Sequence, residues 1–254
     1  MAEENVQKID LKKIFPSLNQ RLKILIKFPT RNRPHKFEMT IRKYMYMAQF
    51  KDDLKFLISL DKDDKDLQKY LNIIQQFDNT INFNVTINEP AGKIAACNIG
   101  MHLIHEWDIV ILASDDMDCQ KFGWDEIIRQ EMLSHYPDLD GVLFHNDGYL
   151  GQKLNTMCIM GRKYYEKFQY IYHPSYISLW CDNHFMEVAN MLNKQTYFPE
   201  CLFKHEHFSN SKNISQDALM RINESFYYKD KKIYEKLKLD NFGLLKDKNG
   251  NWTT

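Results

Sequence analysis

Apolar residues follow two alternating patterns over the first half of the chain. Short apolar runs predict strands at residues 22–28, 54–60, 81–87 and 109–113, and the last of these is rich in β-branched residues. The segments between these runs carry apolar residues three or four positions apart, which predicts helices, as in Phe37, Ile41, Tyr44 and Ala48. Strands that alternate with helices predict an α/β fold in which helices cover both faces of a parallel sheet.

The pattern changes in the second half. The third predicted helix opens at residues 90–93, and its apolar face is expected to comprise Ile94, Cys97, Met101 and Ile104. A fourth helical pattern follows Trp124. Apolar runs at 141–145 and 156–160 then follow each other without a helix between them. Two successive strands without a helix between them predict that an antiparallel strand is added to the sheet, which is then mixed but mostly parallel.

The remaining segments differ in composition. Residues 164–180 are dense in aromatic side chains, which favours core packing, with a sugar-binding face as the alternative. From about residue 215 the chain is charged and helical in pattern, with a Gly-Asn-rich end, which predicts a peripheral helical appendage. We therefore expect an N-terminal extension (1–20), an α/β domain (21–212) and a C-terminal helical tail (213–254).

Composition narrows the classes of function. Lys plus Arg and Asp plus Glu are equal at 34 each, so no global charge draws the protein to nucleic acid or to an anionic membrane. Five scattered cysteines without a CxxC pair indicate reduced thiols. The N-terminus has no apolar signal region and no stretch approaches the roughly 18 apolar residues of a membrane span, which predicts a cytoplasmic protein.

Three acids, Asp115, Asp116 and Asp118, follow the apolar run 109–113. That run predicts a strand buried on both faces, and ligands bind at the carboxyl ends of strands in open α/β sheets. Acids so close together repel one another unless a cation lies between them, and carboxylate oxygens suit Mg²⁺ or Mn²⁺. The sequence therefore predicts a metal site, with a helix N-cap bearing solvated acids as the alternative.

The strand ends also carry a family resemblance. The first strand ends in Pro-Thr-Arg-Asn-Arg-Pro (29–34), the second in Asp61 and the fourth in Ser114-Asp115-Asp116. In this order and spacing, over roughly residues 22–208, the chain resembles a GT-A (Rossmann-like) glycosyltransferase and is most similar to glycosyltransferase family 2. The resemblance implies a nucleotide-sugar-binding half (21–120) and an acceptor-binding half (121–212).

The resemblance also implies roles for individual residues. The positions that would contact the nucleotide-sugar are Pro29, Thr30, Arg31, Arg33, Asp61, Lys93, Ser114 and Asp115. Asp116 would bind Mn²⁺ or Mg²⁺ together with Asp115 or Asp118, because this chain offers both an adjacent pair and an Asp-x-Asp pair.

Two later segments complete the candidate site. Asp182 lies where the family carries its catalytic acid at the start of a helix, so it is the candidate general base, with a helix N-cap as the alternative. His205 and His207 would share one face of a strand, as metal ligands or diphosphate contacts, with a surface or hydrogen-bonded structural role as the alternative.

We therefore expect a metal-dependent, inverting glycosyltransferase that moves a sugar from a nucleotide-sugar, a UDP-sugar in the first instance, to a hydroxyl acceptor such as a glycan. A nucleotidyltransferase is a rival, but residues 30–33 lack the glycine-rich phosphate loop that it requires. Transfer to a modified base in DNA is disfavoured by the neutral charge. A non-catalytic nucleotide- or sugar-binding module is the third rival, and the retained acids argue against it.

Overall fold

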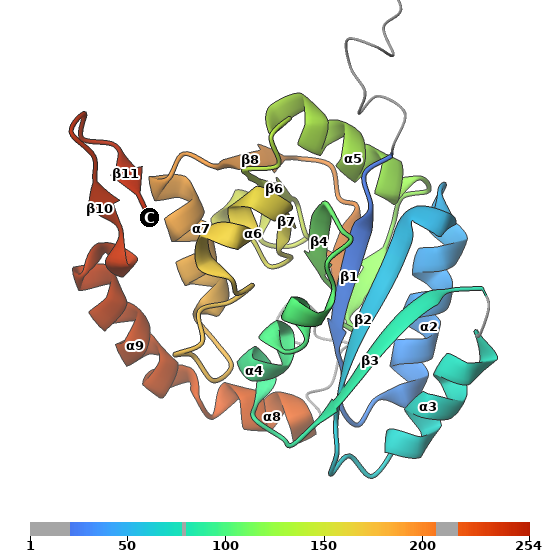
Figure 1. Ribbon diagram of the computed structural model, residues 1–254. Coiled ribbons are helices and arrows are strands. Elements are labelled where there is room, and N and C mark those ends of the chain that lie inside the picture. Colours follow the sequence, from blue (N-terminus) through green and yellow to red (C-terminus); the bar gives the residue numbers. More distant parts are fainter. Residues whose placement is uncertain (1–20, 78–79, 207–217) are drawn as a thin grey trace, which may run out of the picture.

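The computed structural model describes residues 21–77, 80–206 and 218–254. Within these residues a seven-stranded sheet has the order β3-β2-β1-β4-β7-β6-β8 (Figure 1). Its strands are β1 (Ile24–Pro29), β2 (Leu54–Asp61), β3 (Asn82–Asn88), β4 (Ile109–Leu112), β6 (Val142–His145), β7 (Ile159–Gly161) and β8 (Gln195–Phe198). Two small antiparallel pairs are β5 (Met117–Cys119) with β9 (Phe203–His205) and β10 (Leu245–Lys246) with β11 (Trp252–Thr253).

Helices lie on both faces of the sheet (Figure 1). They are α2 (Pro34–Met47), α3 (Leu67–Gln76), α4 (Lys93–Asn98), α5 (Trp124–His135), α6 (Arg162–Phe168), α7 (Cys181–Met191), α8 (Ala218–Glu224) and α9 (Tyr227–Leu239). β1 pairs in parallel with β2 and β4, whereas β7 is antiparallel to both β4 and β6. The predicted mixed, mostly parallel α/β sheet is confirmed.

The strands are almost continuously apolar because both faces of the sheet are covered. On β1, Ile24, Ile26 and Phe28 pack with α2, α3 and α5, while Leu25 faces the opposite layer with α4, α6 and α7. All four side chains are fully buried. Burial of one such side chain contributes roughly 1.5 to 3 kcal/mol, so the two apolar layers fix the position of the strand ends.

The third helix is shorter than the sequence pattern predicts. α4 ends at Asn98, and Gly100 follows with a φ of 81° before a short 3-10 turn. A Cβ on Gly100 would lie 2.8 Å from the Thr86 side chain, so both backbone angle and space require glycine there. The apolar face survives this break, because Met101 and Ile104 remain buried.

The C-terminal helix α9 packs on the domain through three partly buried side chains. Ile233, Tyr234 and Leu237 of α9 pack against the apolar layer that contains α4 and α7. Figure 1 shows α9 on the outer side of α7. None of the described helices is at once long and apolar enough to cross a membrane.

Candidate active site

The carboxyl ends of β1, β2 and β4 meet at one edge of the sheet because the three strands are parallel. The register pairs Pro29 with Ser59, and Lys27 with Leu112, so the polar segments that follow these strands start at neighbouring positions. These segments are residues 30–33, 61–64 and 114–118. The edge is therefore rich in charge directly above an apolar interior.

The first two segments are tied together. Arg31 makes an ion pair with Asp61, with 2.7 Å between Nη1 and Oδ2, and a second one with Asp63. The Tyr70 hydroxyl lies 3.1 Å from the Thr30 hydroxyl and accepts a hydrogen bond of 2.7 Å from the Arg33 backbone N–H. Tyr70 thus holds the loop after β1 in place, and the predicted residues Thr30, Arg31 and Asp61 do lie together.

The three acids after β4 separate toward different partners. Asp115 accepts a hydrogen bond of 2.8 Å from the Arg33 guanidinium, and its side chain is only 7% exposed. Burial and the neighbouring Asp116 raise the pKa of Asp115 to about 6, although Arg33 lowers it. Asp118 instead pairs with Lys43 at 2.6 Å, in a half-exposed position.

Asp116 differs from both of its neighbours. The Ser114 hydroxyl donates to one of its oxygens, and Nε2 of His205 lies 3.7 Å from the other. Burial alone would raise the pKa of Asp116, but His205, Ser114 and the positive charge of Lys93 hold that pKa well below its usual range. Asp116 is therefore a mostly buried carboxylate whose surroundings favour the ionised form, the form that binds a metal ion.

The β5–β9 ribbon brings His205 to this carboxylate. Met117 pairs with His205 and Asp118 with Lys204, and the Glu206 N–H donates to the Asp116 carbonyl at 2.7 Å. Opposite residues of an antiparallel pair share a face, so Asp118 lies on the face away from His205. His207, the other predicted histidine, lies outside the described residues.

The residues present fit a divalent cation that takes further ligands from its substrate. Among residues 21–77, 80–206 and 218–254, no three His, Cys, Asp or Glu side chains form a complete metal-binding group. Asp116 and His205 offer one carboxylate and one imidazole. Mg²⁺ sites of substrate-binding enzymes commonly use one or two protein ligands together with phosphate oxygens and water. The geometry thus favours Asp116 with His205 over Asp116 with Asp115 or with Asp118.

Lys93 and Asp182 lie at the starts of two helices on the same face of the sheet. Lys93 is the first residue of α4, and its side chain is exposed. Desolvation lowers the pKa of Lys93, but its electrostatic interactions, among them those with the carboxylates of Asp182 and Asp116, raise that pKa overall. Asp182 lies in the first turn of α7. Burial raises the pKa of Asp182, while the Lys93 charge opposes this rise.

The alternative assignment of Asp182 as a helix N-cap is wrong. α7 begins at Cys181, and the N-cap is Trp180 with a φ of 64°. Asp182 accepts a hydrogen bond of 2.9 Å from the Asn183 N–H next to it. A carboxyl group whose pKa is raised toward neutral pH is a better proton acceptor from a hydroxyl than an ordinary one, so the environment of Asp182 suits a general base.

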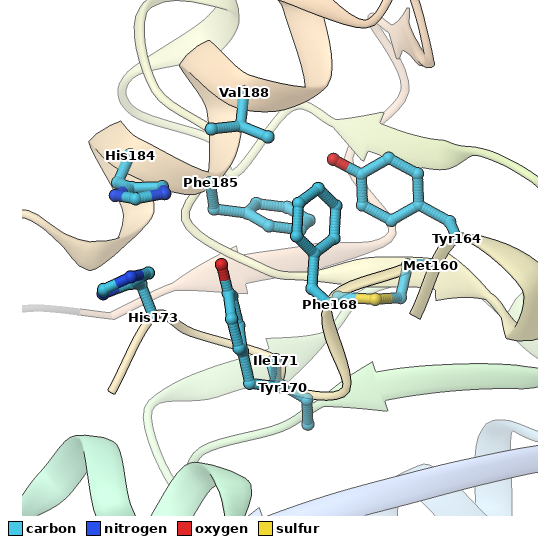
Figure 2. Close-up of a pocket in the computed structure, with 9 residues that line it drawn as sticks. All are labelled: Met160, Tyr164, Phe168, Tyr170, Ile171, His173, His184, Phe185 and Val188. Carbon is cyan, nitrogen blue, oxygen red and sulfur yellow. The ribbon is translucent and has the colours of Figure 1, made fainter. Parts of the chain in front are cut away.

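The aromatic segment packs into the core, as favoured from the sequence. Tyr164, Tyr172 and Tyr176 are at most 5% exposed. A slot remains between α6 and α7, lined by rings such as Phe168 and Phe185, with His173 and His184 stacked at 5.0 Å between ring centroids (Figure 2). Its volume of about 20 Å³ suffices for about one water molecule. The slot in this form is too small for a sugar ring.

Two residues that organise this edge were missed from the sequence, Lys43 and Tyr70. Lys43 pairs with Asp118, and Tyr70 holds the backbone at Arg33. Both belong to helical patterns in which a Lys or a Tyr is ordinary, so local sequence carries no signal for either role.

Comparison with solved structures identifies the fold. A mannosyltransferase from Pyrobaculum calidifontis, PcManGT, solved with GDP-Man and Mn²⁺, superposes with a TM-score of 0.60 at 11% identity, over 82% of this chain and 70% of that one. The chain has a GT-A-like glycosyltransferase fold. S. aureus TarS, residues 1–349 with UDP-GlcNAc, matches this GT-A-like chain with a TM-score of 0.58 at 13% identity, over 78% of this chain.

Comparison of the sequence with protein families and with curated proteins finds no match. The GT-A-like chain spans 60% of the TarS 1–349 structure and 37% of a longer TarS structure, whose TM-score is also 0.58. At these identities the likeness establishes the fold, and activity has to be argued from the residues of this chain.

Proposed function

We propose that the protein is a metal-dependent glycosyltransferase that transfers a sugar from a nucleotide-sugar to a hydroxyl acceptor. The observation that carries this proposal is geometric: the carboxylate of Asp116 lies 3.7 Å from Nε2 of His205, at the sheet edge where β1, β2 and β4 end. PcManGT, solved with GDP-Man and Mn²⁺, and TarS, solved with UDP-GlcNAc, provide support from the same fold.

The donor nucleotide is proposed to bind along the loops that follow β1 and β2. Pro29 ends β1 beside Ser59, and the neighbouring Thr30, Arg31 and Asp61 offer a hydroxyl, a guanidinium and a carboxylate. A base and a ribose present hydrogen-bond donors and acceptors that such groups match. Of the possible nucleotides, we propose a uridine diphosphate sugar.

The diphosphate is proposed to bind between Asp116 and Lys93. Lys93 is exposed and lies at the start of α4, where its charge is available to a phosphate. Asp116 and His205 would hold Mn²⁺ or Mg²⁺. When bound, such an ion neutralises the negative charge of the departing nucleoside diphosphate as a Lewis acid. Ser114 donates to Asp116 and so orients the carboxylate.

Asp182 is proposed to accept the proton of the acceptor hydroxyl. Its raised pKa and its position at the start of α7, within electrostatic reach of Lys93, support this role. A base of this kind is what an inverting, single-displacement transfer requires. We propose inversion and a glycan acceptor bound by residues 121–212, opposite the donor-binding residues 21–120, with residues 213–254 as the C-terminal tail.

Thermal-shift measurements test the donor site first. The purified protein is heated with UDP, GDP, CDP and TDP and with their sugars, each with Mn²⁺ and with a chelator. A nucleotide present at 100 times its dissociation constant stabilises the native state by about 2.7 kcal/mol. We expect a rise in midpoint with UDP that requires Mn²⁺. If no nucleotide raises the midpoint in either condition, the proposal fails.

A further inference from the structure

Asp230, in the C-terminal helix α9, is fully buried. Its carboxylate accepts hydrogen bonds from three consecutive backbone N–H groups, those of Ile177 at 3.1 Å, Ser178 at 2.8 Å and Leu179 at 2.8 Å. Buried carboxylates are costly unless they are fully hydrogen-bonded. The loop backbone and Asp230 therefore stabilise each other, across about 50 residues of sequence.

The same loop touches both helix starts of the candidate site. The Ile177 carbonyl accepts a hydrogen bond of 3.3 Å from the Ile94 N–H, in the first turn of α4 beside Lys93. At its other end the loop reaches Trp180, whose φ of 64° makes the sharp entry into α7 and Asp182. A movement of residues 177–179 would thus shift Asp182 directly and Lys93 through Ile177.

A second set of contacts joins α9 to α7. The Trp180 and Tyr234 rings lie 5.0 Å apart between centroids, and the Tyr234 hydroxyl donates to Glu187. Lys238 pairs with the same Glu187 at 2.6 Å. Most of these groups are at least partly exposed, whereas Asp230 makes the buried contact with the loop backbone. Asp230 is therefore the group in α9 that fixes the loop conformation.

We propose that Asp230 is a positioning residue for the transfer reaction: it holds residues 177–179 and so sets the place of Asp182 against the bound donor. This inference rests on the proposed function, because Asp182 has a role only if the protein transfers a sugar. Asp230 itself does not touch the substrates. Its effect is on geometry, and misplacement of a reacting group by about 1 Å can cost about a hundredfold in rate.

The test compares Asp230→Asn with the wild type and with Glu235→Gln, each in the whole 254-residue chain. Asn is nearly isosteric but has only one acceptor oxygen and would direct an NH₂ group at a backbone N–H. Glu235 is an exposed residue of the same helix, paired with Lys231 at 3.8 Å, so its replacement removes one negative charge but leaves the three hydrogen bonds to Asp230 in place. Transfer is measured at saturating donor, and amide hydrogen exchange is measured for residues 177–179.

We expect Asp230→Asn to lower kcat about tenfold to a hundredfold and to speed exchange of the three amides, while exchange in β1 and β4 stays the same. Glu235→Gln should match the wild type in both measurements. Asp230→Glu keeps the charge and serves as the second variant if Asp230→Asn does not fold; we expect a smaller fall in kcat. Unchanged kcat in a folded Asp230 variant would overturn the inference.

The proposed function and the positioning role of Asp230 would be contradicted by different results. If the wild type neither binds a nucleotide nor transfers a sugar, the proposed function is wrong and the role of Asp230 with it. If the wild type transfers a sugar and the Asp230 variants transfer it equally fast, only the positioning role is wrong. In that case the three hydrogen bonds serve the stability of the tail alone.

Discussion

The acids at the charged sheet edge have different partners on its two sides. On the side of α2, Asp115 and Asp118 are each neutralised by a side chain of that helix or its N-cap, Arg33 at 2.8 Å and Lys43 at 2.6 Å. On the side of β9 and α7, the partner of Asp116 is a histidine at 3.7 Å. We call the side with Asp115 and Asp118 the closed side, because both acids are paired with a cationic side chain there. The side with Asp116 is the open side.

This difference indicates where a ligand can bind. A carboxylate already paired with Arg or Lys must lose that partner before it binds a metal ion, and the loss costs free energy. Asp116 can keep its partner instead, because His205 in its neutral form could bind the same ion. The open side also holds Lys93 and Asp182, whose opposite charges influence each other's pKa. Catalysis is accordingly expected on the open side and rigidity on the closed side.

The largest effect is expected for Asp182→Asn on the open side. An amide cannot accept the acceptor proton, so the transfer rate should fall about 10²- to 10⁴-fold. Binding of the donor, measured by thermal shift with Mn²⁺, should stay close to that of the wild type. Substantial residual transfer would assign the base elsewhere, and a retaining reaction would remove the need for it.

Asp116→Asn should lower the transfer rate about 10²- to 10³-fold, because one electrostatic stabiliser of the leaving group is lost. This variant, unlike Asp182→Asn, should also lose the Mn²⁺ dependence of nucleotide binding. Isothermal titration with UDP, in the presence and absence of Mn²⁺, distinguishes the Asp116→Asn variant from the Asp182→Asn variant. Unchanged Mn²⁺-dependent affinity would show that Asp116 is not a metal ligand.

On the closed side, Arg33→Met should affect stability. The change leaves the mostly buried Asp115 without its ion-pair partner, and breaking such a pair costs about 3 kcal/mol in the free energy of unfolding. Urea denaturation measures this loss. The double variant Arg33→Met with Asp115→Asn should recover most of it, and equal stability of the single variant and the wild type would contradict the closed-side model.

The buried side chain of Lys27 should make the folding stability depend on pH. It is fully buried in β1 and donates to the Ile99 carbonyl at 2.8 Å, and burial lowers its pKa from 10.5 to about 7, with a small opposing effect of Cys97. Between pH 7 and 10.5 the unfolded chain therefore holds a proton that the folded protein has released, so folding stability rises with pH.

The slope of this rise is at most about 1.4 kcal/mol per pH unit. Lys27→Met should remove it, and the difference between the two unfolding curves over this pH range isolates Lys27 from other groups. Parallel pH profiles for the variant and the wild type would show that Lys27 does not titrate in this window.

The smallest effect is expected for Asp118→Asn. Its pair with Lys43 is about 40% exposed on both sides (39% and 41%), and such surface pairs contribute less than about 1 kcal/mol. Mn²⁺-dependent nucleotide binding should be unchanged, which makes this variant the matched control for Asp116→Asn. A loss of Mn²⁺ dependence in Asp118→Asn would restore the Asp-x-Asp pair as the metal site.

Much of the donor half was predictable because its signals are local. Hydrophobic periodicity located β1, β2, β3 and β4, and parallel pairing then required their carboxyl ends to meet. That requirement alone brings Arg31 to Asp61, which are 30 residues apart. The partners of the acids were not predictable in this way, because Arg33 and Lys43 reach Asp115 and Asp118 across 82 and 75 residues.

The burial of Asp230 in the C-terminal helix could not be read from local sequence. Asp230 lies in a run of lysines and tyrosines that is typical of a solvated helix, yet it is buried against a loop 51 to 53 residues earlier. The break of α4 at Gly100 is a milder case, since glycine marks a possible helix end but the crowding by Thr86 arises from the neighbouring strand β3.

By itself, the sequence determined the alternation of strands and helices, the edge at which the strand ends gather and the residue types available there, because these depend on periodicity and on the parallel order of the strands. The tertiary structure alone decided which acid stays open, that His205 joins it and that α9 holds the loop before α7. Those outcomes depend on which distant side chains arrive within a few ångströms, and local patterns do not encode such distances.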